Sequence, residues 1–140
     1  MSEPYAGGCA CGAVRYEIKS EPLFQNHCHC QQCQKLSGTG HGSYLTFPGR
    51  AEAGLTGEVS IWGVAADNGV EKRHAFCPTC GAPVWLTFSA SPDLIAVHAA
   101  SLDDPGRFKP QAITYGVRAP AWDTMDPAIQ TFERMPGSPA

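Results

Sequence analysis

The sequence has few large apolar side chains and no long apolar run. Leu, Ile, Val and Phe account for 25 of its 140 residues. No segment approaches the roughly 20 consecutive apolar residues that a membrane-spanning helix needs. The first residues, Met1–Tyr5, lack the charged and apolar regions of a secretory signal. We therefore expect a cytoplasmic protein with a thin hydrophobic core and no membrane partner.

The sequence also has no large excess of basic or of acidic residues. Ten basic and thirteen acidic residues give a net charge of −3. Proteins that bind the phosphate backbone of nucleic acids usually carry an excess of Lys and Arg, so the sequence predicts no nucleic acid partner. The length suits one domain. We expect that domain over residues 1–125 and a partly flexible C-terminal tail over residues 126–140.

Most of the chain alternates apolar and polar residues with the period of two that is typical of half-buried strands. Turn-forming residues are frequent, with 15 glycines and 12 prolines. The expected strands are Val14–Ile18, Ser43–Phe47, Glu58–Ala65, Val70–Phe76, Pro83–Phe88 and Leu94–His98. The sequence therefore predicts a mainly β fold of short antiparallel strands.

Three local signals refine this prediction. Asn68-Gly69 favours a type I′ turn, which would pair Ser60–Ala65 with Val70–Phe76 as an antiparallel hairpin. One short helix is expected over Gln31–Leu36, ended by Gly38. A second helical turn is expected after Asp103-Asp104-Pro105, because Asp and Pro suit the start of a helix.

Seven cysteines fall into three clusters. The clusters are Cys9 with Cys11, then Cys28, Cys30 and Cys33, and then Cys77 with Cys80. An odd number of cysteines cannot all pair within one chain, and disulfides are rare in the reducing cytoplasm. Metal binding is therefore favoured over a disulfide framework.

The first and third clusters predict a structural zinc site. Each is a closely spaced cysteine pair followed by a glycine, Gly12 or Gly81, and such pairs form compact chelating turns. Together Cys9, Cys11, Cys77 and Cys80 complete a tetrahedral set of four ligands. Structural zinc contributes on the order of 10–16 kcal/mol to folding, a large term for a chain with so little apolar side-chain volume.

The second cluster, Cys28, Cys30 and Cys33, has no further cysteine to complete a tetrahedron. Three protein ligands and one open position are typical of a catalytic zinc ion. Two alternatives remain open. Cys9 and Cys11 could join this cluster, although Cys77 and Cys80 would then lack partners.

In the other alternative, a histidine closes the second site and makes it structural. The candidates are His27, His29, His41 and His98. His74 is not among them, because the polar segment Glu71–His74 suggests the solvated face of a strand.

The order and the flanks of these motifs are specific. They are Cys9-x-Cys11-Gly12, then His27-Cys28-x-Cys30-x-x-Cys33-x-x-Leu36-Ser37-Gly38, then Arg73-x-x-Phe76-Cys77-x-x-Cys80-Gly81, and later Ser101-Leu102-Asp103-Asp104-Pro105 and Trp122. In this arrangement the chain resembles the glutathione-dependent formaldehyde-activating enzyme (Gfa)/centromere protein V family, from about Tyr5 to Trp122.

The resemblance implies an Mss4-like fold, a β-tent of short antiparallel sheets around structural zinc. It also implies two zinc ions per chain. Cys9, Cys11, Cys77 and Cys80 match the family's structural ligands, and Cys28, Cys30 and Cys33 match its catalytic ligands. The implied activity joins glutathione, or a similar small thiol, to formaldehyde or a related small aldehyde. In the reverse direction the enzyme is a carbon–sulfur lyase.

The alternative function is a non-catalytic zinc-binding module of the same fold that binds a protein or a small ligand. His41 bears on this choice, because it is a candidate fourth ligand or base. The two carboxylates of glutathione would need cationic partners, for which Arg15, Arg73, Arg107 and Arg118 are the candidates.

Overall fold

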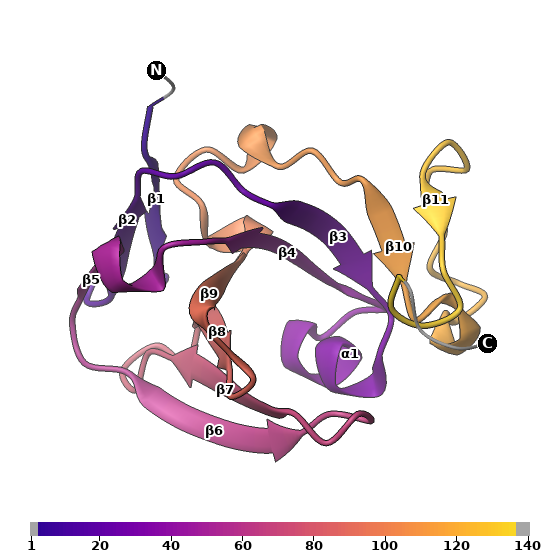
Figure 1. Ribbon diagram of the computed structural model, residues 1–140, viewed down its shortest axis with the longest axis horizontal. Helices are drawn as coiled ribbons and strands as arrows, with labels where there is room; N and C mark the ends of the chain where they lie inside the picture. Colours follow the sequence, from indigo (N-terminus) through magenta and orange to yellow (C-terminus); the bar gives the residue numbers. More distant parts are fainter. Residues whose placement is uncertain (1–2, 137–140) are drawn as a thin grey trace.

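The structure, a computed structural model that describes residues 3–136, contains two β-sheets (Figure 1). The large sheet has eight strands in the order β11-β10-β3-β4-β9-β8-β7-β6. In chain order these are β3 (Phe24–Cys28), β4 (Gly42–Phe47), β6 (Ser60–Ala65), β7 (Glu71–Phe76), β8 (Pro83–Phe88), β9 (Ser91–His98), β10 (Ala112–Thr114) and β11 (Gln130–Thr131). The small sheet contains β1 (Tyr5–Gly8), β2 (Arg15–Ile18) and β5 (Gly54–Thr56) in the order β1-β2-β5.

The predicted mainly β fold class is confirmed, and most neighbouring strands are antiparallel, as expected. The exception is β10, which pairs in parallel with both β3 and β11. A parallel pair needs a long connection that returns the chain to the same end of the sheet. The connection from β3 to β10 is long, because it contains β4 to β9.

Within the described residues there is one α-helix, α1 (Gln31–Ser37), and it closely matches the predicted helix. Cys30 caps its start, because the Cys30 sulfur accepts a hydrogen bond from the Cys33 N–H at 3.2 Å. Gly38 ends it with a left-handed backbone (φ +76°), which glycine adopts without steric cost. Four short 3₁₀ helices complete the chain: Arg50–Glu52, Ala99–Ser101, Pro105–Arg107 and Gly116–Arg118. The third is the helical turn predicted after Asp104.

The predicted hairpin is present, since β6 and β7 pair antiparallel over their whole length. The predicted turn type is wrong. A type I′ turn needs positive φ at both central residues, whereas Gly69 has φ +84° and Asn68 has no positive φ. The turn instead closes through a hydrogen bond from Gly69 N–H to Ala66 O at 2.9 Å.

Five strands were not foreseen: β1, β3, β5, β10 and β11. The segment of β3, Phe-Gln-Asn-His-Cys, is largely polar and lacks β-branched residues, so its sequence is a weak strand signal. It becomes a strand because β4 and β10 pair with it on both sides. β11 lies within the expected tail of residues 126–140 and joins the large sheet. The end of that tail, residues 137–140, lies outside the described residues.

The core consists of two clusters on opposite faces of the large sheet. Neighbouring residues on β4, β8 and β9 divide between them, because side chains alternate along a strand. Leu45, Trp85 and Val97 pack in the larger cluster with Tyr16 and other residues of the small sheet. The smaller cluster is Cys28, Cys30, Cys33, Tyr44, Leu86 and Ala96, with Phe88 and Tyr115 packed against it.

The smaller cluster lies on the concave side of the large sheet, beside α1. Figure 1 shows α1 between the β3–β4 and β6–β7 parts of the sheet. Gln32 on α1 also donates a hydrogen bond to Ala65 O at the end of β6. The fold therefore places the second cysteine cluster inside the curve of the sheet.

Within residues 3–136, no helix has the length and apolar character needed to cross a membrane.

Candidate metal centres and the adjoining pocket

The structure brings Cys9, Cys11, Cys77 and Cys80 together, with all four sulfurs within 4.8 Å of one another. The Cys9 and Cys11 sulfurs are 3.6 Å apart, and those of Cys11 and Cys77 are 3.7 Å apart. A tetrahedral zinc ion with Zn–S bonds of about 2.3 Å requires sulfurs about 3.8 Å apart. The measured separations therefore fit a zinc ion without rearrangement of the chain.

Two tight turns create this group of four. The β1–β2 turn ends in Gly12 (φ +82°), and the β7–β8 turn ends in Gly81 (φ +79°). Backbone N–H groups also point at the sulfurs, since Val14 N–H donates to Cys9 Sγ at 3.2 Å and Thr79 N–H donates to Cys77 Sγ at 3.4 Å. The group therefore links the small sheet to the large sheet.

Cys28, Cys30 and Cys33 form a separate group whose sulfurs lie within 4.8 Å of one another. Cys28 ends β3, Cys30 caps α1, and Cys33 lies in the first turn of α1. All three are buried, with 8% exposure or less. The structure thus brings together each of the two expected sets of cysteines.

The three buried thiols influence one another's ionisation. Hydrogen bonds from Cys30 and Cys33 lower the pKa of Cys28 to about 3. The interaction with Cys28, followed by that with Cys30, raises the pKa of Cys33. A second and a third thiolate in this space would repel the first. A divalent cation is the partner that allows all three to be ionised, so the chemistry of this donor set fits a metal ion. The sulfurs of Cys30 and Cys33 are 2.7 Å apart and would separate to about 3.8 Å on binding zinc.

The candidate histidines lie elsewhere. His29 and His41 group with Asp123: Asp123 Oδ2 is 2.7 Å from Nδ1 of His41 and 3.5 Å from Nδ1 of His29. His29 Nδ1 also donates to the Gly40 carbonyl at 2.8 Å, so this nitrogen carries a proton. Of residues 3–136, no histidine belongs to the group formed by the three sulfurs.

The other two candidates also have different surroundings. His27 Nδ1 pairs with Ser43 Oγ at 2.8 Å. The His98 ring packs on Tyr44 with its centroid 4.9 Å away, and its Nε2 is buried without a hydrogen-bond partner.

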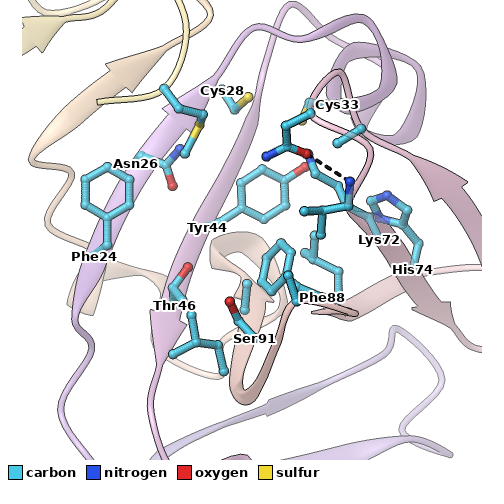
Figure 2. A pocket seen from close by; sticks show the side chains of 18 of the residues that line it. Phe24, Asn26, Cys28, Cys33, Tyr44, Thr46, Lys72, His74, Phe88 and Ser91 are labelled. Carbon is cyan, nitrogen blue, oxygen red and sulfur yellow. Dashed lines mark hydrogen bonds between the residues drawn. The ribbon is translucent and has the colours of Figure 1, made fainter. Parts of the chain in front are cut away.

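A pocket of about 400 Å³ lies directly beside the three-cysteine group (Figure 2). Cys28 and Cys33 line one part of it, and Tyr44 extends across it toward Cys33. The Tyr44 hydroxyl is buried and has no hydrogen-bond partner. Burial is the largest cause that raises its pKa, so the hydroxyl keeps its proton.

His74 also lines the pocket, and the expectation of a solvated position for it is wrong. Its side chain is buried, with 3% exposure, and neither ring nitrogen has a partner. Burial, assisted by the charge of Lys72, lowers its pKa to about 4, which leaves the ring neutral at pH 7. The sequence could have indicated this position, because side chains two residues apart on a strand share a face. Val70, Lys72 and His74 are spaced in this way and all line the pocket.

Fold and site together define a class: small β proteins in which one group of four cysteines joins two sheets and a second group of three faces a pocket. Comparison with known proteins identifies the family within this class. The model of the glutathione-dependent formaldehyde-activating enzyme family matches residues 4–118, and the chain belongs to that family.

One individual protein supports this assignment, and a second supports the fold. A Halomonas elongata protein that carries the family's name is 31% identical over 103 residues. The match covers 69% of this chain and 64% of that relative's length. The crystal structure of a Rhodobacter sphaeroides protein superposes with a TM-score of 0.54 at 22% identity, over 70% of this chain and 87% of the other. This second likeness supports the fold alone.

Proposed function

We propose that the protein is a zinc-dependent enzyme of the carbon–sulfur lyase type. Its substrate is the adduct of formaldehyde, or a related small aldehyde, with glutathione or a similar small thiol. The observation that carries this proposal is the group of three buried cysteines, two of which, Cys28 and Cys33, line a pocket of about 400 Å³, with no histidine in the group among residues 3–136. Membership of the glutathione-dependent formaldehyde-activating enzyme family supports the same reaction.

Each chain would hold two zinc ions. Cys9, Cys11, Cys77 and Cys80 would hold a structural ion, because their sulfurs have tetrahedral spacing. The three-cysteine group of Cys28, Cys30 and Cys33 would hold a catalytic ion. When bound, that ion supplies an open coordination position that accepts an electron pair from sulfur or oxygen.

The reaction itself is an addition to a carbonyl group. In the direction of synthesis, the thiol sulfur bonds to the aldehyde carbon, the C=O π bond opens, and the oxygen takes up the proton that the thiol releases. The reverse reaction breaks the C–S bond and returns the proton to sulfur. No oxidant or reductant is needed.

The chain contributes binding and orientation. The unpartnered Tyr44 hydroxyl, beside Cys33, would donate a hydrogen bond to the oxygen on which charge develops during addition. Leu86 and Phe88 exclude water from the same part of the pocket, which strengthens that hydrogen bond.

Replacement of Cys30 by serine tests the proposal. Wild-type protein, purified without oxygen, should contain two zinc ions per chain and accelerate the exchange of formaldehyde with its adduct of glutathione or of a similar small thiol, as followed by exchange NMR. Cys30→Ser should retain one zinc ion and lose the acceleration. Lys35→Ala, at an exposed position of the same helix, is the matched control and should resemble the wild type. Unchanged zinc content and exchange rate in Cys30→Ser would refute the proposal.

A further inference from the structure

The pocket beside the three-cysteine group is mainly apolar. Its walls include Phe24, Leu86, Phe88 and Leu94. The part next to the sulfurs is buried, since Tyr44 and Leu86 are 6% and 4% exposed. The outer part includes Leu23, which is 61% exposed, and Met135, which is 41% exposed. An apolar surface therefore extends from solvent to the sulfurs.

Charge is almost absent from this surface. Apart from the cysteines, Lys72 is the only charged residue among the described residues that line the pocket. Lys72 is half-buried on β7, and no carboxylate of residues 3–136 forms an ion pair with it. The other polar groups nearest the sulfurs, the Tyr44 hydroxyl and the His74 ring, are neutral and lack partners. The pocket thus offers one cation and, among its buried polar atoms, two neutral groups without a partner.

No arginine is among the described residues that line the pocket. Arg15 pairs with Asp103, and its Nη1 is 2.8 Å from Oδ1. Arg107 lies over the Tyr5 ring and donates to backbone carbonyls near the chain start. Arg73 pairs with Glu71, and neither it nor Arg118 lines the pocket.

Glutathione fits such a surface poorly. It carries two carboxylates and one ammonium group, and each charge needs a partner when it leaves water. Lys72 can pair with one carboxylate. The second carboxylate finds no further cation, and the ammonium group finds no carboxylate, among the described lining residues.

We infer that the thiol accepted by this pocket is an apolar molecule with a single anionic group. Its apolar part would contact Phe24, Leu86 and Phe88, its anionic group would lie at Lys72, and its sulfur would lie at the three-cysteine group. This inference rests on the proposed function and narrows its substrate from glutathione-like thiols to a less charged class.

Titration with three thiols tests the inference. The probes are 6-mercaptohexanoate, which has an apolar chain and one carboxylate, 6-mercaptohexan-1-ol, which has the same chain and no charge, and glutathione. Dissociation constants are measured calorimetrically, without oxygen, on zinc-loaded protein, and zinc content is checked afterwards. We expect 6-mercaptohexanoate to bind at least about tenfold more tightly than glutathione.

The Lys72→Met variant isolates the anion site. It should weaken binding of 6-mercaptohexanoate by about tenfold, to the level of the uncharged thiol, and leave binding of 6-mercaptohexan-1-ol unchanged. Lys19→Met is the matched control, because Lys19 is exposed and outside the pocket. It removes the same charge and should change neither constant.

The possible results separate the inference from the function on which it rests. Tighter binding of glutathione than of 6-mercaptohexanoate would overturn the inference and leave a thiol-binding enzyme in place. Equal effects of Lys72→Met and Lys19→Met would also overturn it. Failure of all three thiols to bind would overturn both the inference and the proposed function.

Discussion

Tyr44 and Tyr16 are both buried tyrosines, but their hydroxyl groups have different surroundings. The Tyr16 hydroxyl is 2.6 Å from Ser101 Oγ. The Tyr44 hydroxyl has no partner and lies on the wall of the pocket. A buried polar group without a partner reduces stability, so it is kept where a ligand supplies the missing partner. This contrast indicates a structural role for Tyr16 and agrees with the role of Tyr44 in the proposed reaction.

Removal of the Tyr16 hydroxyl should therefore reduce stability, whereas removal of the Tyr44 hydroxyl should slow the proposed reaction. Tyr16→Phe should lower the free energy of unfolding by about 1 kcal/mol, because the Ser101 hydroxyl loses its partner. Tyr44→Phe should leave that free energy unchanged, or raise it by up to about 1 kcal/mol, and slow adduct exchange about tenfold or more. Urea denaturation and exchange NMR give the two quantities. A stability loss in Tyr44→Phe equal to that in Tyr16→Phe would contradict the assignment.

At the residue scale, the grouping of the cysteines could be predicted from the sequence. The residues that lie beside them in the pocket could not. The spacing of Cys28, Cys30 and Cys33 places three sulfurs within a few residues of one another, so short-range geometry determines their grouping. Tyr44 and His74 belong to strands β4 and β7, which the large sheet separates by β8 and β9. Their approach to the same pocket depends on the curvature of the sheet, which no local sequence pattern encodes.

At the scale of elements, α1 positions two of the three cysteines: Cys30 caps its start, and Cys33 lies in its first turn. Its limits follow from local chemistry: Cys30 caps the start, and Gly38 ends the helix with a left-handed backbone. A Cβ added at Gly38 would meet no other atom within 4 Å. Any cost of a substitution there therefore comes from the backbone conformation alone.

Substitution of Gly38 tests this account of the helix. Gly38→Ala should lower the free energy of unfolding by about 1 kcal/mol, because alanine disfavours positive φ. Gly38→Asn should cost less, because asparagine tolerates that region. Thermal unfolding measures both variants. Equal losses for alanine and asparagine would show that the left-handed conformation is not the cause.

The elements also differ in whether a local sequence pattern predicts them. The helix and the β6–β7 hairpin were predictable because their hydrogen bonds join residues close in the sequence. β3 and β10 were not, because their partners are far away: Asn26, for example, pairs with Ala112. Strands defined by distant partners need little strand propensity of their own.

At the scale of the whole molecule, the group of Cys9, Cys11, Cys77 and Cys80 connects the two sheets. Its proposed zinc ion would contribute on the order of 10 kcal/mol to folding, which is comparable to the entire stability of a typical domain of about 5–15 kcal/mol. The three-cysteine group lies within one face of the large sheet. Loss of metal from the two sites should therefore have unequal consequences.

Serine substitutions compare the two sites. Cys11 is exposed, so Cys11→Ser removes a ligand without disturbing the core. This variant should lose the structural zinc ion and be largely unfolded at room temperature, by far-ultraviolet circular dichroism. Cys30→Ser should stay folded with one zinc ion. A melting temperature of Cys11→Ser equal to that of the wild type would contradict the structural role of the four-cysteine group.

The sequence by itself determined the mainly β class, the helix, the hairpin and the two sets of cysteines, because each depends on spacing within a short segment or on a count of residues. The tertiary structure decided the parallel pairing of β10, the separation of His29 and His41 from the three sulfurs, and the pocket with its single cation. Those features arise where distant strands meet on the concave face of one sheet. Their chemistry therefore depends on long-range contacts that residue spacing does not encode.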